Sequence, residues 1–235
     1  MKKKLVIFSG AGISAESGIP TFRDQNGIWE THRIEEVATP QAWASNPKLV
    51  LKFYNERRRK ILKVNPNKAH LEIKKLEEFF EVVVITQNID DLHERAGSKN
   101  VLHLHGEIFK MRSEKNSNLV YPTKNDIKVG QLAEDGEQLR PHIVWFFEEV
   151  PMMEKAIEIV KQCDYFVVIG SSLVVYPAAS LISYVPQNAL KFIIDPQIPN
   201  HGDKDIFVIQ KPATEGIIEL ATKLKKLMTK LSLLK

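Results

Sequence analysis

Short apolar runs, each bounded by turn or polar residues, recur along the chain and predict β-strands. They are Leu5 to Phe8, Val82 to Ile85, Val101 to Leu104, Phe166 to Ile169, Phe192 to Ile194 and Ile206 to Ile209. Their β-branched content favours strands, and their continuous apolarity is typical of strands buried on both faces of a parallel sheet.

Helical patterns lie between several of these runs, at 68–80, 154–162, 178–184 and 214–234. Strands that alternate with helices predict an α/β fold with a doubly wound parallel, Rossmann-like sheet. The last helix carries an apolar stripe opposite its lysines, which favours docking on the sheet over membrane binding. The stripe comprises Ile217, Ile218, Ala221, Leu224, Leu227, Met228 and Leu231.

Two segments depart from this alternation. Residues 31–66 are polar, Pro-punctuated and helical in pattern, and residues 109–140 are mostly polar with few apolar anchors. We interpret both as insertions that form a smaller lobe. The larger, Rossmann-like domain is then expected to comprise residues 1–30, 67–108 and 141–235.

Composition and charge narrow the class of protein. A chain of 235 residues with 43% hydrophobic and 26% charged residues has the size and make-up of a globular protein. Its 33 Lys and Arg against 29 Asp and Glu are mixed in sign, so no nucleic-acid partner is expected. The single cysteine, Cys163, excludes an internal disulfide and a thiolate zinc cage. The apolar runs are too short for export or membrane spanning, which favours a cytoplasmic protein with no membrane partner.

Gly10 to Ala15 matches the G-x-G-x-x-G/A dinucleotide fingerprint in its required context of strand, turn and helix. Glycines let the backbone approach a pyrophosphate, and the helix N-terminus offers free N–H groups. An acidic residue is expected about 20 residues further on in dehydrogenases. Here that region is the loop 19–24, which disfavours hydride transfer. A Gly-rich turn without a ligand remains the alternative.

Polar residues follow two other strands where a ligand crevice is expected. Asn88 and Asp90 come directly after the strand at 82–85, although both residue types are also common caps and turn residues. Three interpretations of His103 and His105 are open: they are metal ligands, or hydrogen-bonded core histidines, or one is a base and the other its structural neighbour. A metal needs three or four donors, to which Asp90 or Asp91 would have to contribute. A single base fits better, because an imidazole pKa near 6.5 suits proton abstraction near neutrality.

These residues together resemble the sirtuins, which are NAD-dependent protein lysine deacylases. The matching blocks come in the family's order and span residues 5 to about 210. They are Gly10 to Asp24, Thr86 to Gly97, His103 to Glu107, Arg140 to Phe146 and Gly170 to Ala179.

The resemblance implies NAD as the cofactor and assigns residues to it. Those implied to bind NAD are Gly10, Ala11, Gly12, Phe22, Arg23, Gln87, Asn88, Asp90, Gly170, Ser171, Ser172 and Asp195. Asn88 and Asp90 would also position the scissile glycosidic bond, which makes them catalytic. Asp195 stands where the family usually has Asn near the adenine ribose.

The resemblance also implies the partner and the reaction. Val144 and Phe146 match the groove that receives an acylated-lysine protein segment as an added strand. The acyl oxygen would attack the ribose as nicotinamide leaves, and His105 would deprotonate the ribose diol. The products would be nicotinamide, 2′-O-acyl-ADP-ribose and free lysine.

A finer resemblance concerns the acyl group. Ala38, Tyr54 and Arg57 match the sirtuin subgroup that removes succinyl and malonyl groups. There a small residue widens the pocket, and the Tyr and Arg bind the distal carboxylate. Tyr54 and Arg57 share a helix face at i and i+3. The alternative is a solvated face, because Arg57 opens the basic run 57–60.

The chain also departs from the family pattern. Many sirtuins carry two C-x-x-C pairs for structural zinc in the segment equivalent to 109–140, which has no cysteine here. We therefore expect no zinc and no other metal site. The lobe would be held by Met111, Leu119, Val120, Tyr121, Leu132 and Leu139. Phe147 replaces a family Gly, and a ring there would crowd the peptide groove.

Three other functions stay open at this point. They are a mono-ADP-ribosyltransferase, a non-catalytic NAD or ADP-ribose binding module, and a metallohydrolase that uses His103 and His105. For the deacylase, we expect a monomer that acts on acylated-lysine proteins.

Overall fold

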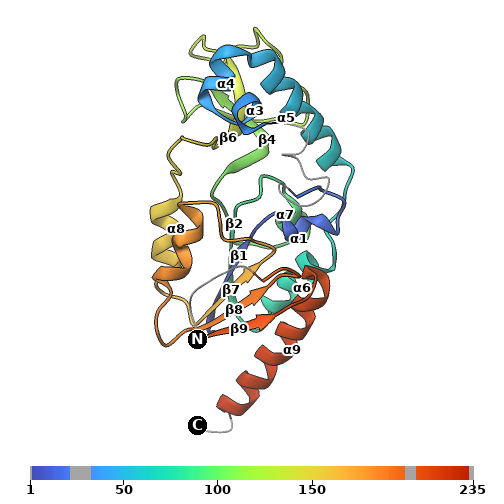
Figure 1. Ribbon diagram of the computed structural model, residues 1–235, viewed down its shortest axis with the longest axis vertical. Helices are drawn as coiled ribbons and strands as arrows, with labels where there is room; N and C mark the ends of the chain where they lie inside the picture. The colour runs from blue at the N-terminus through green and yellow to red at the C-terminus, as the bar shows by residue number, and fades with distance from the viewer. Residues whose placement is uncertain (1, 22–32, 199–204, 233–235) are drawn as a thin grey trace.

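The computed structural model describes residues 2–21, 33–198 and 205–232, the last few without side-chain detail. A six-stranded sheet and a three-stranded sheet lie toward opposite ends of the elongated molecule (Figure 1). Within the described ranges, no helix is both long and apolar enough to cross a membrane.

The larger sheet is parallel throughout, with the strand order β3-β2-β1-β7-β8-β9. Its strands are β1 (Lys4–Ser9), β2 (Glu81–Thr86), β3 (Val101–His103), β7 (Tyr165–Ile169), β8 (Leu190–Ile194) and β9 (Ile206–Ile209). Each predicted apolar run forms one of them, which confirms the doubly wound α/β fold. The order reverses between β1 and β7, and ligands of such sheets bind at this switch point, beyond the carboxyl ends of the strands.

Helices cover both faces of this sheet. On one face, α6 (Lys68–Leu76) and α9 (Ala213–Ser232) pack together, and the buried side of α9 confirms its predicted docking. The side chain of Leu231, expected on that stripe, lies outside the described residues. On the other face lie α8 (Met153–Val160) and η1 (Ala178–Tyr184), which is a 3-10 helix. The short helices α1 (Gly12–Ala15) and α7 (Leu92–Arg95) follow β1 and β2.

In the part of the smaller lobe that the structure describes, three helices pack with an antiparallel sheet of order β5-β4-β6. Its helices are α3 (Ile34–Val37), α4 (Pro40–Ser45) and α5 (Pro47–Leu62), and its strands are β4 (Gly106–Ser113), β5 (Val120–Pro122) and β6 (Leu139–Ile143). Thr39 and Asn46 start α4 and α5 by accepting hydrogen bonds from backbone N–H groups of the first turn. The sheet thus extends a few residues beyond the segment 109–140, and the exact domain boundaries stay a prediction.

The interior of the small lobe differs from the expected one. Leu139 is buried, but Val120 and Leu132 are 36% and 58% exposed and cannot hold the lobe together. Val120 begins β5, none of whose three residues is fully buried, and Leu132 lies outside the named strands in an isolated bridge with Gln138. Their place is taken by Ile108 and Ile127, which are buried in one cluster with α4 and α5.

A buried polar centre ties α5 to the rest of this lobe. Arg58 is fully buried, and its guanidinium donates to the Ile108 carbonyl at 2.8 Å, to Asn55 Oδ1 at 2.7 Å and to the Asn125 carbonyl at 3.2 Å. The Asn55 side chain in turn pairs with the backbone of Ile127. Among the described residues, no group of three or more His, Cys, Asp or Glu side chains is placed to hold a metal ion.

Candidate active site

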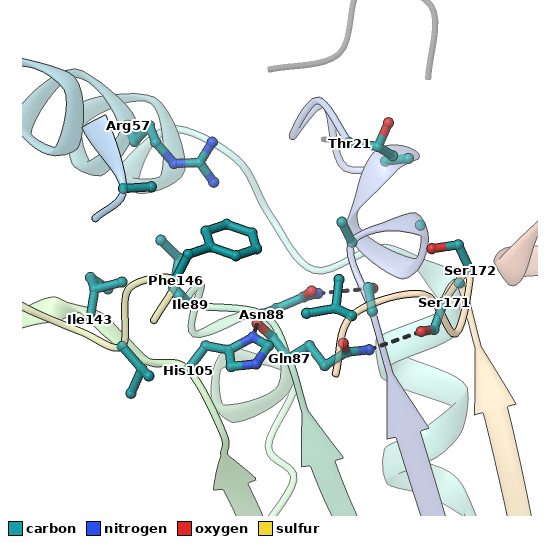
Figure 2. Close-up of a pocket in the computed structure, with 18 of the residues that line it drawn as sticks. Thr21, Arg57, Gln87, Asn88, Ile89, His105, Ile143, Phe146, Ser171 and Ser172 are labelled. Atoms are coloured by element: carbon teal, nitrogen blue, oxygen red, sulfur yellow. Dashed lines mark hydrogen bonds between the residues drawn. The ribbon is translucent and has the colours of Figure 1, made fainter. Parts of the chain in front are cut away.

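One cavity of about 400 Å³ lies between the two lobes, beyond the carboxyl ends of β1, β2 and β7 (Figure 2). It brings together most residues that the sequence singled out. They are Gly10, Ala11, Gly12, Gln87, Asn88, His105, Gly170, Ser171, Ser172 and Asp195, with Ala38, Tyr54, Arg57, Val144 and Phe146. Phe22 and Arg23 lie outside the described residues.

At one end of the cavity, the turns after β1 and β7 touch through backbone alone. The N–H of Gly12 donates to the Gly170 carbonyl at 2.9 Å. A Cβ on Gly10 would lie 2.6 Å from that same carbonyl oxygen, and Gly170 has a φ of +61°. Only glycine permits both the contact and the backbone angle. Because bare backbone, Ser171 and Asp195 line this end, the residues fit a dinucleotide such as NAD.

Gln87 and Asn88 follow β2 and are fixed in the middle of the cavity. Gln87 Nε2 donates to Ser171 Oγ at 2.8 Å, which joins the segments after β2 and β7 (Figure 2). Asn88 Nδ2 donates to the Gly10 carbonyl at 3.1 Å and to Ser14 Oγ at 3.2 Å. These bonds hold the two side chains in one orientation.

Asp90 is as buried as Asn88 and, together with it, lines a small recess beside the main cavity. It accepts hydrogen bonds from Ser14 Oγ at 3.0 Å and from the Leu92 N–H at 3.1 Å. Burial raises the pKa of Asp90, although both bonds oppose the shift. Ser14 therefore links Asn88 to Asp90, a role that sequence reasoning missed. The available signal was a small hydroxyl side chain inside the Gly10 to Ala15 fingerprint, next to the apolar Ile13.

His105 and His103 face different surroundings although they are two positions apart. His105 Nδ1 lies 3.0 Å from the Gln87 carbonyl, so the neutral ring carries its proton on Nδ1 and a lone pair on Nε2. The residue lines the cavity, with its ring close to Gln87 (Figure 2). Burial lowers the pKa of His105, which keeps the ring neutral and able to accept a proton.

His103 instead has both ring nitrogens engaged. Nδ1 lies 3.0 Å from the Asn88 carbonyl and Nε2 lies 2.7 Å from Glu94 Oε1. Burial opposes a charge on this ring, but the hydrogen bond and charge of Glu94 outweigh it and raise the pKa of His103. His103 thus positions the segment at Asn88 and has no nitrogen left for a metal.

At the other end of the cavity, Ala38, Tyr54 and Arg57 meet. Tyr54 is buried and packs 6.4 Å from the Trp145 ring, and burial raises the pKa of its phenol to about 12. Its hydroxyl therefore stays a hydrogen-bond donor. The Arg57 side chain extends from α5 toward the cavity, with its guanidinium 5.6 Å from the centre of the Phe53 ring (Figure 2). Arg57 is half-buried and lines the cavity, so the solvated-face interpretation is wrong for this residue.

The segment after β6 closes the cavity on the side of the small lobe. The N–H of Val144 donates to the His105 carbonyl and that of Phe146 donates to the Ala38 carbonyl, each at 3.0 Å. The next residue, Phe147, lines the cavity while its side chain is 84% exposed. Its ring therefore stands at the mouth and leaves the interior open.

The amino-acid sequence is similar to that of known proteins. The model of the Sir2 family matches residues 10–177. An NAD-dependent protein deacylase of Helicobacter pylori is 53% identical over 223 residues, which cover 94% of this chain and 97% of the relative.

Solved structures agree with the sequence relatives. A Sir2 homologue mutant in complex with ADP-ribose superimposes with a TM-score of 0.89 at 39% identity, covering 97% of this chain and 94% of that one. A Sir2 homologue in complex with NAD gives a TM-score of 0.85 at 40% identity, covering 96% and 90%.

Proposed function

Because the chain belongs to the Sir2 family, we infer that it is an NAD-dependent protein deacylase, and we propose that it removes succinyl and malonyl groups besides acetyl groups from lysine. The observation that carries this proposal is that one cavity joins these residues: it runs from the glycine turns, past His105, to Tyr54 and Arg57. We further propose that the enzyme is a cytoplasmic monomer acting on acylated-lysine proteins.

The residues at the glycine end fit NAD, which supplies a glycosidic bond that breaks as nicotinamide leaves and a ribose that accepts the acyl group. In this proposal Gln87 contacts the ribose, and Asn88 and Asp90 line the nicotinamide site. Their bonds to Ser14, Gly10 and Ser171 hold them ready before any ligand arrives. The side chains then need little reorganisation during the reaction.

His105 is the base in this proposal. Its Nδ1–H donates to the Gln87 carbonyl, so Nε2 takes the proton from a ribose hydroxyl. The lowered pKa keeps that nitrogen unprotonated near neutral pH. The ring lies between the NAD end and the acyl end of the cavity. It can therefore deprotonate a ribose hydroxyl at the point where that hydroxyl attacks the acyl carbon.

Arg57 and Tyr54 determine which acyl groups the acyl end of the cavity binds. A guanidinium and a phenol that both donate hydrogen bonds suit a carboxylate at the far end of a succinyl or malonyl chain. Burial lowers the pKa of Arg57, while Tyr54 and Asp90 oppose that shift. The desolvated cation gains from a carboxylate partner, whereas an acetyl group offers none.

We expect Arg57→Ala to lower kcat/KM for succinyl-lysine and malonyl-lysine peptides by about 10- to 100-fold, because a hydrogen bond to a charged partner contributes about 1.5 to 3 kcal/mol. Acetyl-lysine peptides should lose far less. The measurement is nicotinamide release over a panel of acyl peptides, with and without NAD.

Arg59→Ala is the matched control, since Arg59 follows on the same helix but pairs with Asp126 at the surface. It should leave the acyl preference unchanged. Equal losses on acetyl and succinyl peptides in Arg57→Ala would remove the acidic-acyl proposal and leave the deacylase assignment intact.

A further inference from the structure

Phe147 combines two features that a folded chain normally avoids. Its φ is +70°, in the left-handed region that a residue with a Cβ adopts only at a cost in free energy. Its side chain is also 84% exposed, so the phenyl ring gains almost no burial in return. Strained backbone of this kind at a ligand cavity points to a functional demand.

The neighbouring residues impose this conformation. Glu148 accepts hydrogen bonds from Arg140 Nη1 at 2.7 Å, Arg140 Nη2 at 3.2 Å and the Trp145 N–H at 2.8 Å. The Arg140 guanidinium also lies 3.3 Å from the centre of the Trp145 ring. With Phe146 bonded to Ala38, the turn is fixed on both sides of Phe147 and directs its ring outward.

A second exposed aromatic ring lines the same cavity. Tyr176, in the segment between β7 and η1, is 74% exposed. Other exposed apolar side chains, such as Val129 and Leu132, do not line the cavity. The two rings therefore mark the mouth as an apolar, ligand-facing surface.

The position of Phe147 indicates which part of a bound substrate it would meet. The residue directly continues the segment Val144 to Phe146, which closes the cavity beside Ala38 at the acyl end. A lysine whose acyl group reaches Tyr54 and Arg57 must leave its own backbone at the mouth. The side chains that flank this lysine in the substrate are then the groups nearest to Phe147 and Tyr176.

We propose that Phe147 and Tyr176 form an apolar subsite that selects protein substrates with an aromatic or large aliphatic residue next to the acyl-lysine. This inference rests on the proposed function. Aromatic pairs attract beyond the area they bury, so a phenylalanine beside the lysine is the strongest ligand for this subsite.

The test compares peptides that differ only in the residues flanking the acyl-lysine, phenylalanine against glycine, with NAD in excess. For the unaltered protein, kcat/KM should favour the phenylalanine peptide by about tenfold, mostly through KM. Phe147→Gly should bring this ratio close to one. The variant also removes the left-handed strain, so it should melt at or above the temperature of the unaltered protein.

Leu132→Ala is the control, because it removes an exposed apolar side chain away from the cavity and should keep the tenfold ratio. Turnover of both peptides at equal kcat/KM, or a ratio that survives Phe147→Gly, would overturn the subsite and leave the deacylase function standing. No turnover of any acyl peptide would instead overturn the proposed function. A dimer that dissociates in Phe147→Gly would assign the ring to self-association and also overturn the subsite.

Discussion

Replacing His105 by alanine is expected to lower kcat for deacylation by about 10²- to 10⁴-fold, which is the usual contribution of a positioned general base. Affinity for NAD should change little, because the substitution leaves intact the glycine turns and Ser171, which line the NAD end of the cavity. The measurement pairs steady-state nicotinamide release with calorimetric titration of NAD.

The pH profile gives a second readout of the same residue. A base must be unprotonated, and burial lowers the pKa of His105 below its usual value near 6.5. The acid limb of kcat/KM should therefore lie below pH 6.5, with activity falling as pH drops through the lowered pKa. The residual activity of His105→Ala should lack this limb.

His103→Gln is the matched control, since His103 is bonded through both nitrogens and does not line the cavity. Its turnover should stay within about tenfold of the unaltered enzyme, because it acts only through the position of Asn88. Equal losses in the two variants would mean that His105 is not the base.

Replacing Arg58 by methionine is expected to lower the free energy of unfolding of the small lobe by about 3 kcal/mol. The guanidinium is fully buried, and its loss removes the donor to the Ile108 carbonyl and one donor each from the Asn125 carbonyl and Asn55 Oδ1. The last two acceptors keep their hydrogen bonds from Thr123 and Ile127. Burial lowers the pKa of Arg58 only to about 10, so it carries a charge at neutral pH.

Urea unfolding followed by tryptophan fluorescence measures this loss, because Trp43 and Trp145 lie in the core of the small lobe, 5.7 Å apart. Arg59→Met is the control, and as an exposed ion pair it should cost at most about 1 kcal/mol. Similar losses for the two arginines would show that the buried hydrogen bonds do not stabilise this lobe.

The run of arginines shows what sequence alone can and cannot predict. Successive helical residues point about 100° apart, and the structure directs Arg57 into the cavity, Arg58 into the core and Arg59 to the surface. Tyr54 and Arg57 could be paired by their i, i+3 spacing. The burial of Arg58 could not be predicted, because its acceptors at Ile108 and Asn125 come from segments far along the chain.

The large sheet was predictable for a related reason. Most of its strands are buried on both faces, so each is a continuous apolar run that stands out in the sequence. The edge strand β9 is the exception, with Phe207 and Val208 exposed. In the small lobe, half-exposed strands such as β5 leave a weaker pattern, and Val120 and Leu132 were wrongly expected to be internal. Whether such a residue is buried depends on which other segments pack against it in the folded protein.

Within the site, the glycine turns and the polar residues after β2 were predictable from motif and strand position. The position of the two histidines did not separate their roles, because alternation alone leaves His103 and His105 equivalent, and only the family resemblance singled out His105 as the base. Only the hydrogen bonds to Glu94 and to the Gln87 carbonyl separate a structural ring from one with a free nitrogen at the cavity.

The most direct test of the central claim is to identify the products by mass spectrometry after incubation with NAD and a succinyl-lysine or acetyl-lysine peptide. The cavity predicts that nicotinamide appears only when both substrates are present, in equal amount to the deacylated peptide, with the acyl group on ADP-ribose. Nicotinamide formed without an acyl peptide, or ADP-ribose attached to protein in place of acyl-ADP-ribose in solution, would contradict it.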